Sequence, residues 1–324
     1  MPPDARLSRD HPLTVTASRG LAVAVVSFNT RDLLRDLLAS VRSESPAETV
    51  VVDNGSADGS AEMVRAEFPE VRLIVDPANP GFGAAANRGV GATSSPYVLI
   101  LNGDTRLTPG ALAALGAYLD RNPFCAVAGP LLTRADGTPE ASCFPFLGTF
   151  RLALEKSPLG RGLAWIPAVR DRYLILHGPR NQARIVPWVM GAALAVRRSA
   201  FEGVGGFDPA FFLYAEEVDL CYRLQGVGWE VHFAPVATVA HVGGASTNAP
   251  ALRAEMEVQR VRAARQFYRR HYSPARAAAL ETLIQGAMAW RLVRDRARIA
   301  LSRKTGARDR LAEKLAVWRG ALRP

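Results

Sequence analysis

Cysteines are scarce in this 324-residue chain, and long hydrophobic runs are missing. Cys125, Cys143 and Cys221 are odd in number and widely spaced, so they predict neither a disulfide framework nor a zinc site and favour a reducing compartment. No apolar run follows a basic start, and no run of about 18 uncharged apolar residues occurs. We therefore expect no signal peptide and no membrane-spanning helix.

Excess charge is missing from most of the chain. Residues 1–250 carry 22 Lys and Arg against 24 Asp and Glu, a net charge of −2, whereas residues 251–324 carry 18 against 6, a net charge of +12. The surplus of positive charge therefore lies entirely in the C-terminal tail. We expect residues 1–20, which are polar and lack periodicity, to be disordered, residues 21–250 to form the main domain, and residues 251–324 to form a basic helical tail.

Short apolar runs alternate with helical patterns in the first third of the chain. The runs that predict buried strands are Leu21–Phe28, Thr49–Val52, Val71–Val75 and Tyr97–Leu101. Asn29 and Thr30 are expected to cap the helix after the first strand, and a second helix is expected to end at Glu67. Strand and helix alternation of this kind predicts an α/β fold with a mostly parallel, doubly wound sheet and flanking helices.

Two of these strands end in a carboxylate. Asp53 follows the second strand, and Asp104 follows the fourth through the sequence Asn102-Gly103-Asp104. Ligands of open α/β sheets bind in the crevice at the carboxyl ends of the strands, so we expect Asp53 and Asp104 to lie along one edge and to share a ligand. The alternative is that Asn102-Gly103-Asp104 is only a polar turn, because these residue types are common in turns.

The segment before the fourth strand does not form a dinucleotide-binding fingerprint. Residues 79–89 contain Gly81-Phe82-Gly83, but they do not follow the first strand and lack the third glycine at the required spacing. The glycines permit a tight loop, and the small residues from Ala84 onward permit a closely packed helix whose N-terminal amides face a phosphate.

The remaining pattern consists of eight short segments spread over both halves of the chain. Those of the first half are Val25–Asn29, Val51–Ser60, Asn79–Arg88 and Leu101–Asp104. Those of the second half are Trp188–Ala192, Gly205–Asp208, Phe211–Arg223 and His241–Ser246. In order and spacing they resemble family-2 glycosyltransferases with the GT-A fold, and they are most similar to the bacterial rhamnosyltransferase branch.

The resemblance implies a nucleotide-sugar donor, dTDP- or UDP-linked. The residues that it assigns to the donor are Ser27, Asn29, Asp53, Asn54, Asn87, Asn102 and Asp104. It also implies that Asp104 and His241 hold a divalent metal, Mg²⁺ or Mn²⁺, on the diphosphate. Asn102 stands where the family's Asp-x-Asp motif has its first aspartate, and an amide hydrogen-bonds a ribose hydroxyl but adds no negative charge. For His241 the alternative is ordinary packing at a strand end.

The acidic cluster Tyr214–Asp219 is the implied catalytic centre. Inverting transfer needs one base on the face opposite the leaving group, and the resemblance places that base at Glu217, with Glu216 and Asp219 as alternatives. Asp219 also lies four residues before Arg223, which fits a structural ion pair on a helix. The whole patch fits a solvated helix start as well, since acidic residues favour helix N-termini.

The acceptor is expected to meet the second half of the chain. The expected acceptor-binding residues are Trp188, Gly191, Ala192 and Asp219. An aromatic face stacks on a sugar, although a core position for Trp188 is the alternative. Residues 140–187 are Pro-containing and poorly periodic, and such an insert next to a site is often a lid or an acceptor-binding segment.

The tail from residue 251 onward has a helical pattern in which arginines alternate with apolar residues. A basic helix with an apolar face is typical of a helix lying on an anionic membrane surface, and the resemblance implies acceptors that are often lipid-linked. A helical pair packed on the main domain and an oligomer interface are the alternatives. We do not expect nucleic acid as a partner, because stacking aromatics are sparse there.

These features predict an inverting glycosyltransferase that is cytoplasmic and peripheral on the inner face of the cell membrane. By resemblance it moves rhamnose from a nucleotide sugar to a saccharide or lipid-linked acceptor in cell-envelope polysaccharide synthesis. One alternative is a non-catalytic nucleotide-sugar-binding scaffold, which only Asn102 favours. The other is a nucleotidyltransferase, although Ser27–Thr30 does not supply the Gly-rich basic loop that such enzymes use.

Overall fold

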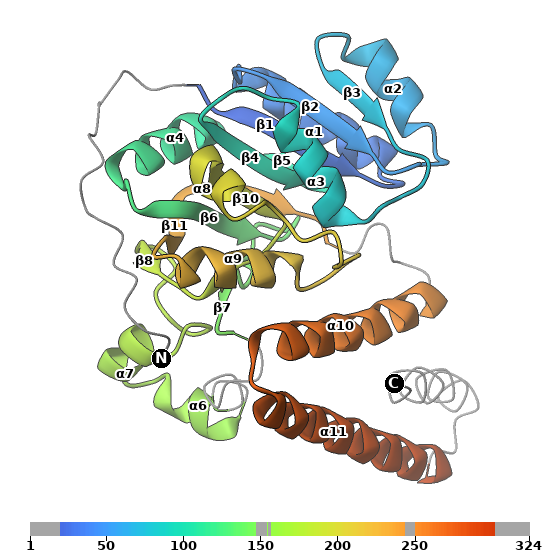
Figure 1. Ribbon diagram of the computed structural model, residues 1–324, viewed down its shortest axis with the longest axis vertical. Coiled ribbons are helices and arrows are strands. Elements are labelled where there is room, and N and C mark those ends of the chain that lie inside the picture. Colours follow the sequence, from blue (N-terminus) through green and yellow to red (C-terminus); the bar gives the residue numbers. More distant parts are fainter. Residues whose placement is uncertain (1–19, 147–153, 155–156, 244–249, 302–324) are drawn as a thin grey trace. The chain divides into compact units, whose positions relative to one another are not determined.

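The structure, a computed structural model, describes residues 20–146, 154, 157–243 and 250–301 (Figure 1). The chain divides into two compact units, one of Met1–Phe212 with Glu216–Ala245 and the other of Leu213–Ala215 with Ser246–Pro324. Residues 1–19, which are expected to be disordered, lie outside the described residues. Gly244–Ser246 and the basic positions beyond residue 301 also lie outside them.

The first unit is built on one large sheet with the strand order β3-β2-β1-β4-β10-β6-β11-β5. Its first four members are β3 (Arg72–Val75), β2 (Thr49–Asp53), β1 (Ala22–Ser27) and β4 (Tyr97–Asn102), and each of these neighbours pairs in parallel. All four strands predicted from the apolar runs are therefore present. The α/β expectation is confirmed, with right-handed helical crossovers expected between parallel neighbours.

One central strand runs against this direction. β10 (Ala193–Arg197) is antiparallel both to β4 and to β6 (Cys125–Thr133), and β11 (Glu230–His241) is parallel to β6. Two short strands, β5 (Thr105–Leu107) and β8 (Arg184–Ile185), pair antiparallel with β11. Because β10 is reversed, its N-terminal end lies at the edge where the parallel strands have their carboxyl ends.

Helices cover both faces of the sheet, so alternate residues of each central strand enter different cores. One core joins Val23, Val25, Leu99 and Leu101 to α1 (Arg31–Ser43), α2 (Ser60–Glu67) and α4 (Ala111–Arg121). The other core joins Ala22, Ala24, Val98 and Ile100 to α3 (Phe82–Gly91), α8 (Arg198–Gly203) and α9 (Glu216–Gly226). The continuous apolar strands are explained by this burial on two faces.

The start of α1 differs from the sequence prediction. Thr30 occupies the N-cap position, but its side chain makes no capping hydrogen bond, because its Oγ1 lies 3.1 Å from the Oγ of Ser27. The Arg31 N–H instead donates to Oδ2 of Asp58 at 2.8 Å. A carboxylate from the loop after β2 therefore caps α1, which joins the two loops at the same edge of the sheet.

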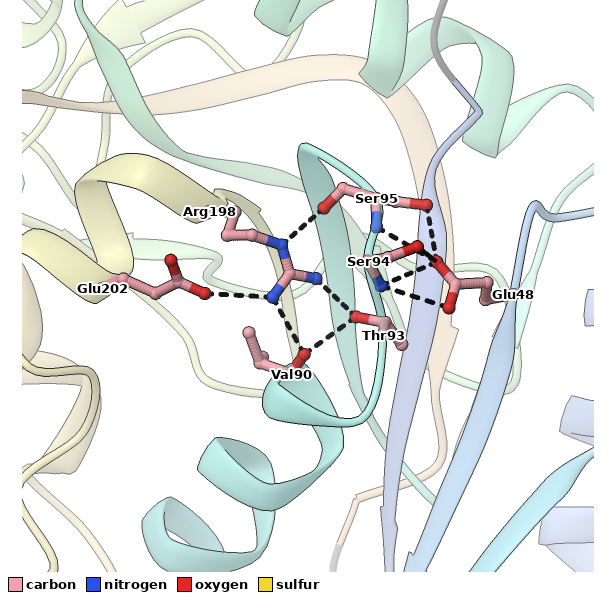
Figure 2. A network of polar contacts seen from close by, with 7 residues as sticks. All are labelled: Glu48, Val90, Thr93, Ser94, Ser95, Arg198 and Glu202. Atoms are coloured by element: carbon pink, nitrogen blue, oxygen red, sulfur yellow. Dashed lines mark hydrogen bonds and ion pairs between the residues drawn. The ribbon is translucent and has the colours of Figure 1, made fainter.

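A polar network holds the turn between α3 and β4 (Figure 2). The Arg198 guanidinium donates to the backbone oxygens of Ser95 at 2.7 Å and Val90 at 3.1 Å and to Oγ1 of Thr93 at 2.6 Å. From the opposite side, Glu48 accepts from the N–H groups of Ser94 at 2.8 Å and Ser95 at 3.0 Å. Burial raises the pKa of Glu48, but these hydrogen bonds outweigh it and hold that pKa below its ordinary value.

Replacing Arg198 is expected to destabilise the fold without touching the candidate site. Arg198→Met removes several charge-assisted hydrogen bonds from a side chain that is only 15% exposed, so we expect the free energy of unfolding to fall by about 3 kcal/mol. Its partner Glu202 is 58% exposed, and Glu202→Gln is expected to cost less than about 1 kcal/mol. Urea unfolding of both variants measures the difference; equal losses would contradict the assignment.

The second unit contains two helices, α10 (Pro250–His271) and α11 (Pro274–Leu301). Phe267 is fully buried, and Arg265, also buried, pairs with Glu281 of α11 at 3.3 Å. Residues 213–215 belong to this unit, since Gln259 Nε2 donates to the Leu213 carbonyl and the Arg260 guanidinium lies 4.6 Å from the Tyr214 ring. None of the helices described is both long and apolar enough to cross a membrane.

Candidate active site

The two carboxylates predicted to share an edge of the sheet do so. β1 lies between β2 and β4, and its register pairs Ser27 with Asp53 and Val26 with Asn102. The Gly103 N–H donates to the Val26 carbonyl at 2.9 Å, which turns the chain toward Asp104. A Cβ on Gly103 would lie 2.7 Å from Oγ1 of Thr30, so only glycine allows this turn to approach β1.

Asp53 and Asn54 present buried acceptor atoms that the described chain leaves unsatisfied. Oδ1 of Asp53 accepts from the Ser56 N–H at 2.9 Å, whereas its Oδ2 is buried and has no hydrogen-bond partner among the residues placed. The Asn54 amide donates to the Gly81 carbonyl at 3.3 Å, and its Oδ1 is buried in the same way. Buried acceptors of this kind call for a donor, which the N–H and O–H groups of a nucleoside can provide.

The other predicted donor residues have different surroundings. Asn29, at φ 52°, accepts from the Ala57 N–H at 2.8 Å and donates its own backbone N–H to Ser56 Oγ at 2.8 Å, so it joins the loops that follow β1 and β2. Asn87 uses both ends of its amide on the backbone of Phe207, at 2.8 and 2.9 Å. Its geometry is that of a structural brace between α3 and the segment before α9.

Asp104 faces a histidine from the far end of the sheet. β11 ends at His241, which pairs with Thr105 in register, and His241 Nε2 lies 3.6 Å from Oδ1 of Asp104. Both side chains are nearly buried, and burial raises the pKa of the Asp104 carboxyl while His241 acts in the opposite direction. Two ligand atoms that each bind one ion at about 2.1 Å lie within about 4 Å of one another. Oδ1 of Asp104 and Nε2 of His241 are therefore close enough to occupy two coordination positions of one divalent cation.

Glu140, which no sequence motif singles out, also lies beside His241. Its Oε2 lies 3.1 Å from Nδ1 of His241, so the imidazole lies between two carboxylates. A bridge between Thr133 and Pro139 holds the segment beside β6. A metal-bound histidine usually has a carboxylate on its other ring nitrogen, which fixes the ring orientation and the tautomer. Within the described chain, no three His, Cys, Asp or Glu residues are themselves arranged to hold a metal.

The acidic pair lies at the start of α9, next to the segment before β10. The Glu217 carboxylate faces Gly191, where a Cβ would lie 3.6 Å from its Cδ and Oε1. The Asn102 N–H donates to the Ala192 carbonyl at 3.1 Å, which brings Gly191 and Ala192 to the edge that carries Asp104. Tyr214 and Ala215 just before the helix have φ values of 69° and 66°, a backbone conformation that costs free energy in residues with a Cβ.

Asp219 has the ion pair that its spacing predicted. The side chain is fully buried, and the Arg223 guanidinium lies 2.7 Å from its Oδ2. Arg223 also donates to the backbone oxygens of Val204 at 2.6 Å and Gly206 at 2.7 Å. This geometry supports α9 and its neighbouring loop and leaves no exposed carboxylate for an acceptor.

Trp188 is half-buried and is engaged on one side. Its ring stacks on Phe144 with centroids 4.6 Å apart, and its Nε1 donates to the Pro145 carbonyl at 2.8 Å. These contacts join β9 (Trp188–Val189) to β7 (Cys143–Phe144). A sugar can therefore stack on Trp188 only from the face opposite Phe144.

Glu216 is the buried member of the pair, and its pH dependence follows. Burial raises its pKa well above the ordinary value, and Glu217 adds to the shift. A raised pKa in the folded state means that stability is fully present below the unfolded-state pKa and is lost as pH rises toward the folded-state pKa. Glu216→Gln removes this loss, so we expect it to stabilise the fold increasingly as pH is raised above the ordinary glutamate pKa of about 4.3.

Urea unfolding across that pH range measures the effect. Glu62→Gln serves as the control, because the Glu62 side chain is 75% exposed on α2 and should give a pH-independent difference. A Glu216→Gln variant whose stability follows the parent protein at every pH would show that this carboxyl is not held neutral by the fold.

Comparison with known proteins identifies the class of protein. A profile of Glycosyl transferase family 2 matches residues 22–203, and a profile of Glycosyl transferase family group 2 matches residues 173–295. The chain belongs to glycosyltransferase family 2 and is a glycosyltransferase with the GT-A fold.

Individual proteins show what the chain is similar to within this class. The chain is 34% identical over 242 residues, 70% of its length and 77% of the relative's, to N-acetylglucosaminyl-diphospho-decaprenol L-rhamnosyltransferase of Mycobacterium tuberculosis (strain CDC 1551 / Oshkosh). Among solved structures it resembles the mannosyltransferase PcManGT of Pyrobaculum calidifontis in complex with GDP-Man and Mn²⁺, with a TM-score of 0.53 at 18% identity over 96% of this chain and 89% of that one. The structural likeness shows the fold, and the sequence likeness confirms the predicted similarity to rhamnosyltransferases.

Proposed function

We propose that the protein transfers rhamnose, with inversion, from a nucleoside diphosphate donor to a lipid-linked saccharide in cell-envelope synthesis. The observation that carries the proposal is the pairing of Asp104 with His241 at the edge where Asp53 keeps an unsatisfied buried oxygen. The choice of rhamnose and of a lipid-linked acceptor rests on the likeness to the decaprenol rhamnosyltransferase.

The first half of the chain holds the donor, at the carboxyl ends of β2 and β4. In the proposed complex, Asp53 and Asn54 accept hydrogen bonds from the nucleoside, and Asn102 bonds the ribose through its amide. Asp104 and His241 would hold Mg²⁺ or Mn²⁺, which neutralises charge on the leaving diphosphate. Glu140 orients His241 from its other nitrogen.

The second half of the chain supplies Glu217, the proposed base for the acceptor hydroxyl. Glu217 faces Gly191 at the same edge, and it is less buried than Glu216. In the proposed reaction Glu217 takes the proton of the attacking hydroxyl, the new C–O bond forms as the bond to the diphosphate breaks, and the nucleoside diphosphate leaves. One displacement inverts the anomeric centre, so no covalent enzyme intermediate forms.

We also propose that the second unit binds an anionic membrane surface. Arg262, Arg265, Arg269 and Arg270 of α10 line one hollow together with Gln266, and Leu283, Trp290 and Val293 of α11 are exposed. Cationic and apolar groups together support attachment to the inner face of the membrane. Failure of vesicles with anionic lipid to retain the protein at low salt would refute this proposal and favour the packing or oligomer alternatives.

Calorimetric titration with dTDP, UDP and GDP, each with and without Mg²⁺ or Mn²⁺, tests the donor proposal. We expect metal-dependent binding of dTDP, followed by turnover of dTDP-rhamnose with a lipid-linked acceptor. Binding of dTDP without any turnover would favour the scaffold alternative. Absence of binding for all three nucleotides would refute the donor proposal.

A further inference from the structure

A basic and aromatic hollow lies in the insert between β7 and β8, away from the residues discussed so far. It has a volume of ≈ 370 Å³ and is lined by Arg161, Ala164, Trp165, Arg170 and His177. These residues come from α6 (Pro158–Leu163), α7 (Pro167–Tyr173) and the turns that follow them. In Figure 1 the two short helices extend from the sheet at the end where β7 lies.

The charge of this insert is strongly one-sided. Residues 157–180 contain four arginines against one aspartate, and neither Lys nor Glu, which gives a net charge of +3 with His neutral. Asp171 accepts from Nε of Arg170 at 2.6 Å and leaves the terminal nitrogens of that guanidinium for another acceptor. Arg161 makes no ion pair within the part of the chain that is described. The hollow therefore offers guanidinium donors suited to phosphate oxygens.

Large apolar side chains around the hollow are turned to solvent. Trp165 is 89% exposed, and Leu159, Ile166 and Tyr173 are 63%, 49% and 57% exposed. Clusters of this kind mark contact surfaces, because a soluble surface rarely leaves so many large apolar groups together in water. Trp and Tyr beside Arg are the side chains that favour the level of lipid headgroups.

The base of the insert is anchored, so the hollow has a defined place in the first unit. Leu174 and Ile175 are buried, and Arg184 of β8 donates to the backbone oxygens of Ile175 at 2.9 Å and of Pro179 at 2.5 Å. A Cβ on Gly178 would lie 2.5 Å from Nη1 of Arg184, so the guanidinium packs directly against this turn. The segment that follows α7 is therefore held in the first unit.

The short two-stranded sheet of β7 and β9 lies beside this insert in the sequence and close to residues of the candidate active site. Glu140, beside His241, precedes β7, and Gly191, beside Glu217, follows β9, which pairs with β7. The insert therefore follows, within a few residues, the segment that carries Glu140, and it is followed by the strand that leads to Gly191.

We infer that the hollow between α6 and α7 binds the diphosphate of a lipid-linked acceptor, with Arg161 and Arg170 on the phosphate oxygens and Trp165 beside the first part of the lipid chain. This inference rests on the proposed function for the identity of the acceptor. It assigns to the insert the recognition of the diphosphate-lipid portion of the substrate, separately from the sugar that reacts near Glu217.

Vesicle binding by the full-length protein tests the assignment. The probes are phosphatidylcholine vesicles that contain a polyprenyl diphosphate, vesicles that contain phosphatidylglycerol at matched surface charge, and phosphatidylcholine alone. We expect Arg161→Gln to weaken binding to the diphosphate vesicles by about tenfold, the effect of losing a charge-assisted hydrogen bond. Trp165→Phe should remove part of the blue shift in tryptophan fluorescence that accompanies binding.

Arg172→Gln is the matched control, because Arg172 carries the same charge on α7 and does not line the hollow. It should change binding to either anionic vesicle by less than about twofold. An equal loss for Arg161→Gln and Arg172→Gln, or an equal loss on both anionic vesicles, would overturn diphosphate recognition in favour of general charge attraction. No loss for Arg161→Gln would overturn the site.

The outcome is independent of the donor experiments. Arg161→Gln should keep the metal-dependent nucleotide binding and the thermal unfolding midpoint of the parent protein. Diphosphate-vesicle binding that depends on Arg161, in a protein that fails to bind any nucleotide, would support the lipid site while refuting the proposed function. Nucleotide binding without Arg161-dependent vesicle binding would support the donor proposal and refute the lipid site.

Discussion

Glu217→Gln is expected to lower the rate of sugar transfer by about 10²- to 10⁴-fold, the usual contribution of a positioned general base. The amide has nearly the same shape as the carboxylate but does not accept a proton from the acceptor hydroxyl. Nucleotide affinity should change little, because Glu217 faces Gly191 at the acceptor side. Single-turnover transfer and calorimetry on the same protein separate the two effects.

Two further variants give this experiment its controls. Glu217→Asp keeps the carboxylate but shortens the side chain, so it should retain part of the activity and the pH dependence that Gln loses. Asp219→Asn breaks the buried pair with Arg223, so it should lower stability rather than act on the chemical step alone. Full turnover in Glu217→Gln would move the base to another residue, with Glu216 as the next to test.

Asp104→Ala is expected to remove the metal dependence of nucleotide binding. The loss of one of the two proposed protein ligands should weaken Mn²⁺-dependent affinity by more than about a hundredfold, since removal of an outer-shell partner alone costs about 10- to 100-fold. Glu140→Gln should fall in that smaller range, because Glu140 contacts His241 and is proposed to orient it rather than to bind the ion. Calorimetry with and without Mn²⁺, together with the electron paramagnetic resonance signal of bound Mn²⁺, measures both.

Asp53→Asn provides the contrast for this series. Its orphan oxygen lies at the end of β2, which β1 separates from β4 and Asp104, so the substitution should weaken nucleotide binding equally with and without metal. If Asp104→Ala behaved in the same way as Asp53→Asn, Asp104 would be a nucleotide contact and not a metal ligand. If Glu140→Gln had no effect on Mn²⁺ binding, its contact with His241 would have no orienting role.

Local patterns were sufficient where one short stretch decides its own structure. The apolar runs around Val51 and Ile100 are buried on both faces, so composition and length alone predict strands there. Asp53 and Asp104 follow such strands directly, and parallel neighbours bring their ends together through the register of β1. The i,i+4 spacing of Asp219 and Arg223 likewise predicted a contact that one helix makes by itself.

Contacts between segments far apart in the chain were not predicted from local sequence patterns. Glu140 carries no local signal, since it is a single carboxylate in a Pro-containing insert, and only the pairing of β6 with β11 brings it to His241. Asp58 caps a helix that begins 27 residues before it, and Thr30, the expected cap, turns to Ser27. Asn87 appeared as a donor residue because its motif matched, whereas its amide is used by Phe207 across 120 residues.

The sequence by itself determined the four strands of the first third of the chain, the edge of the sheet that Asp53 and Asp104 share, and the family, because each depends on burial periodicity or on motifs contained in short stretches. Tertiary structure decided which side chains face one another. The reversal of β10 brings Gly191 to the carboxyl ends of the parallel strands, and the packing of α9 buries Glu216 but leaves Glu217 facing that glycine. Such choices depend on partners far apart in the chain, whose distances no local pattern encodes.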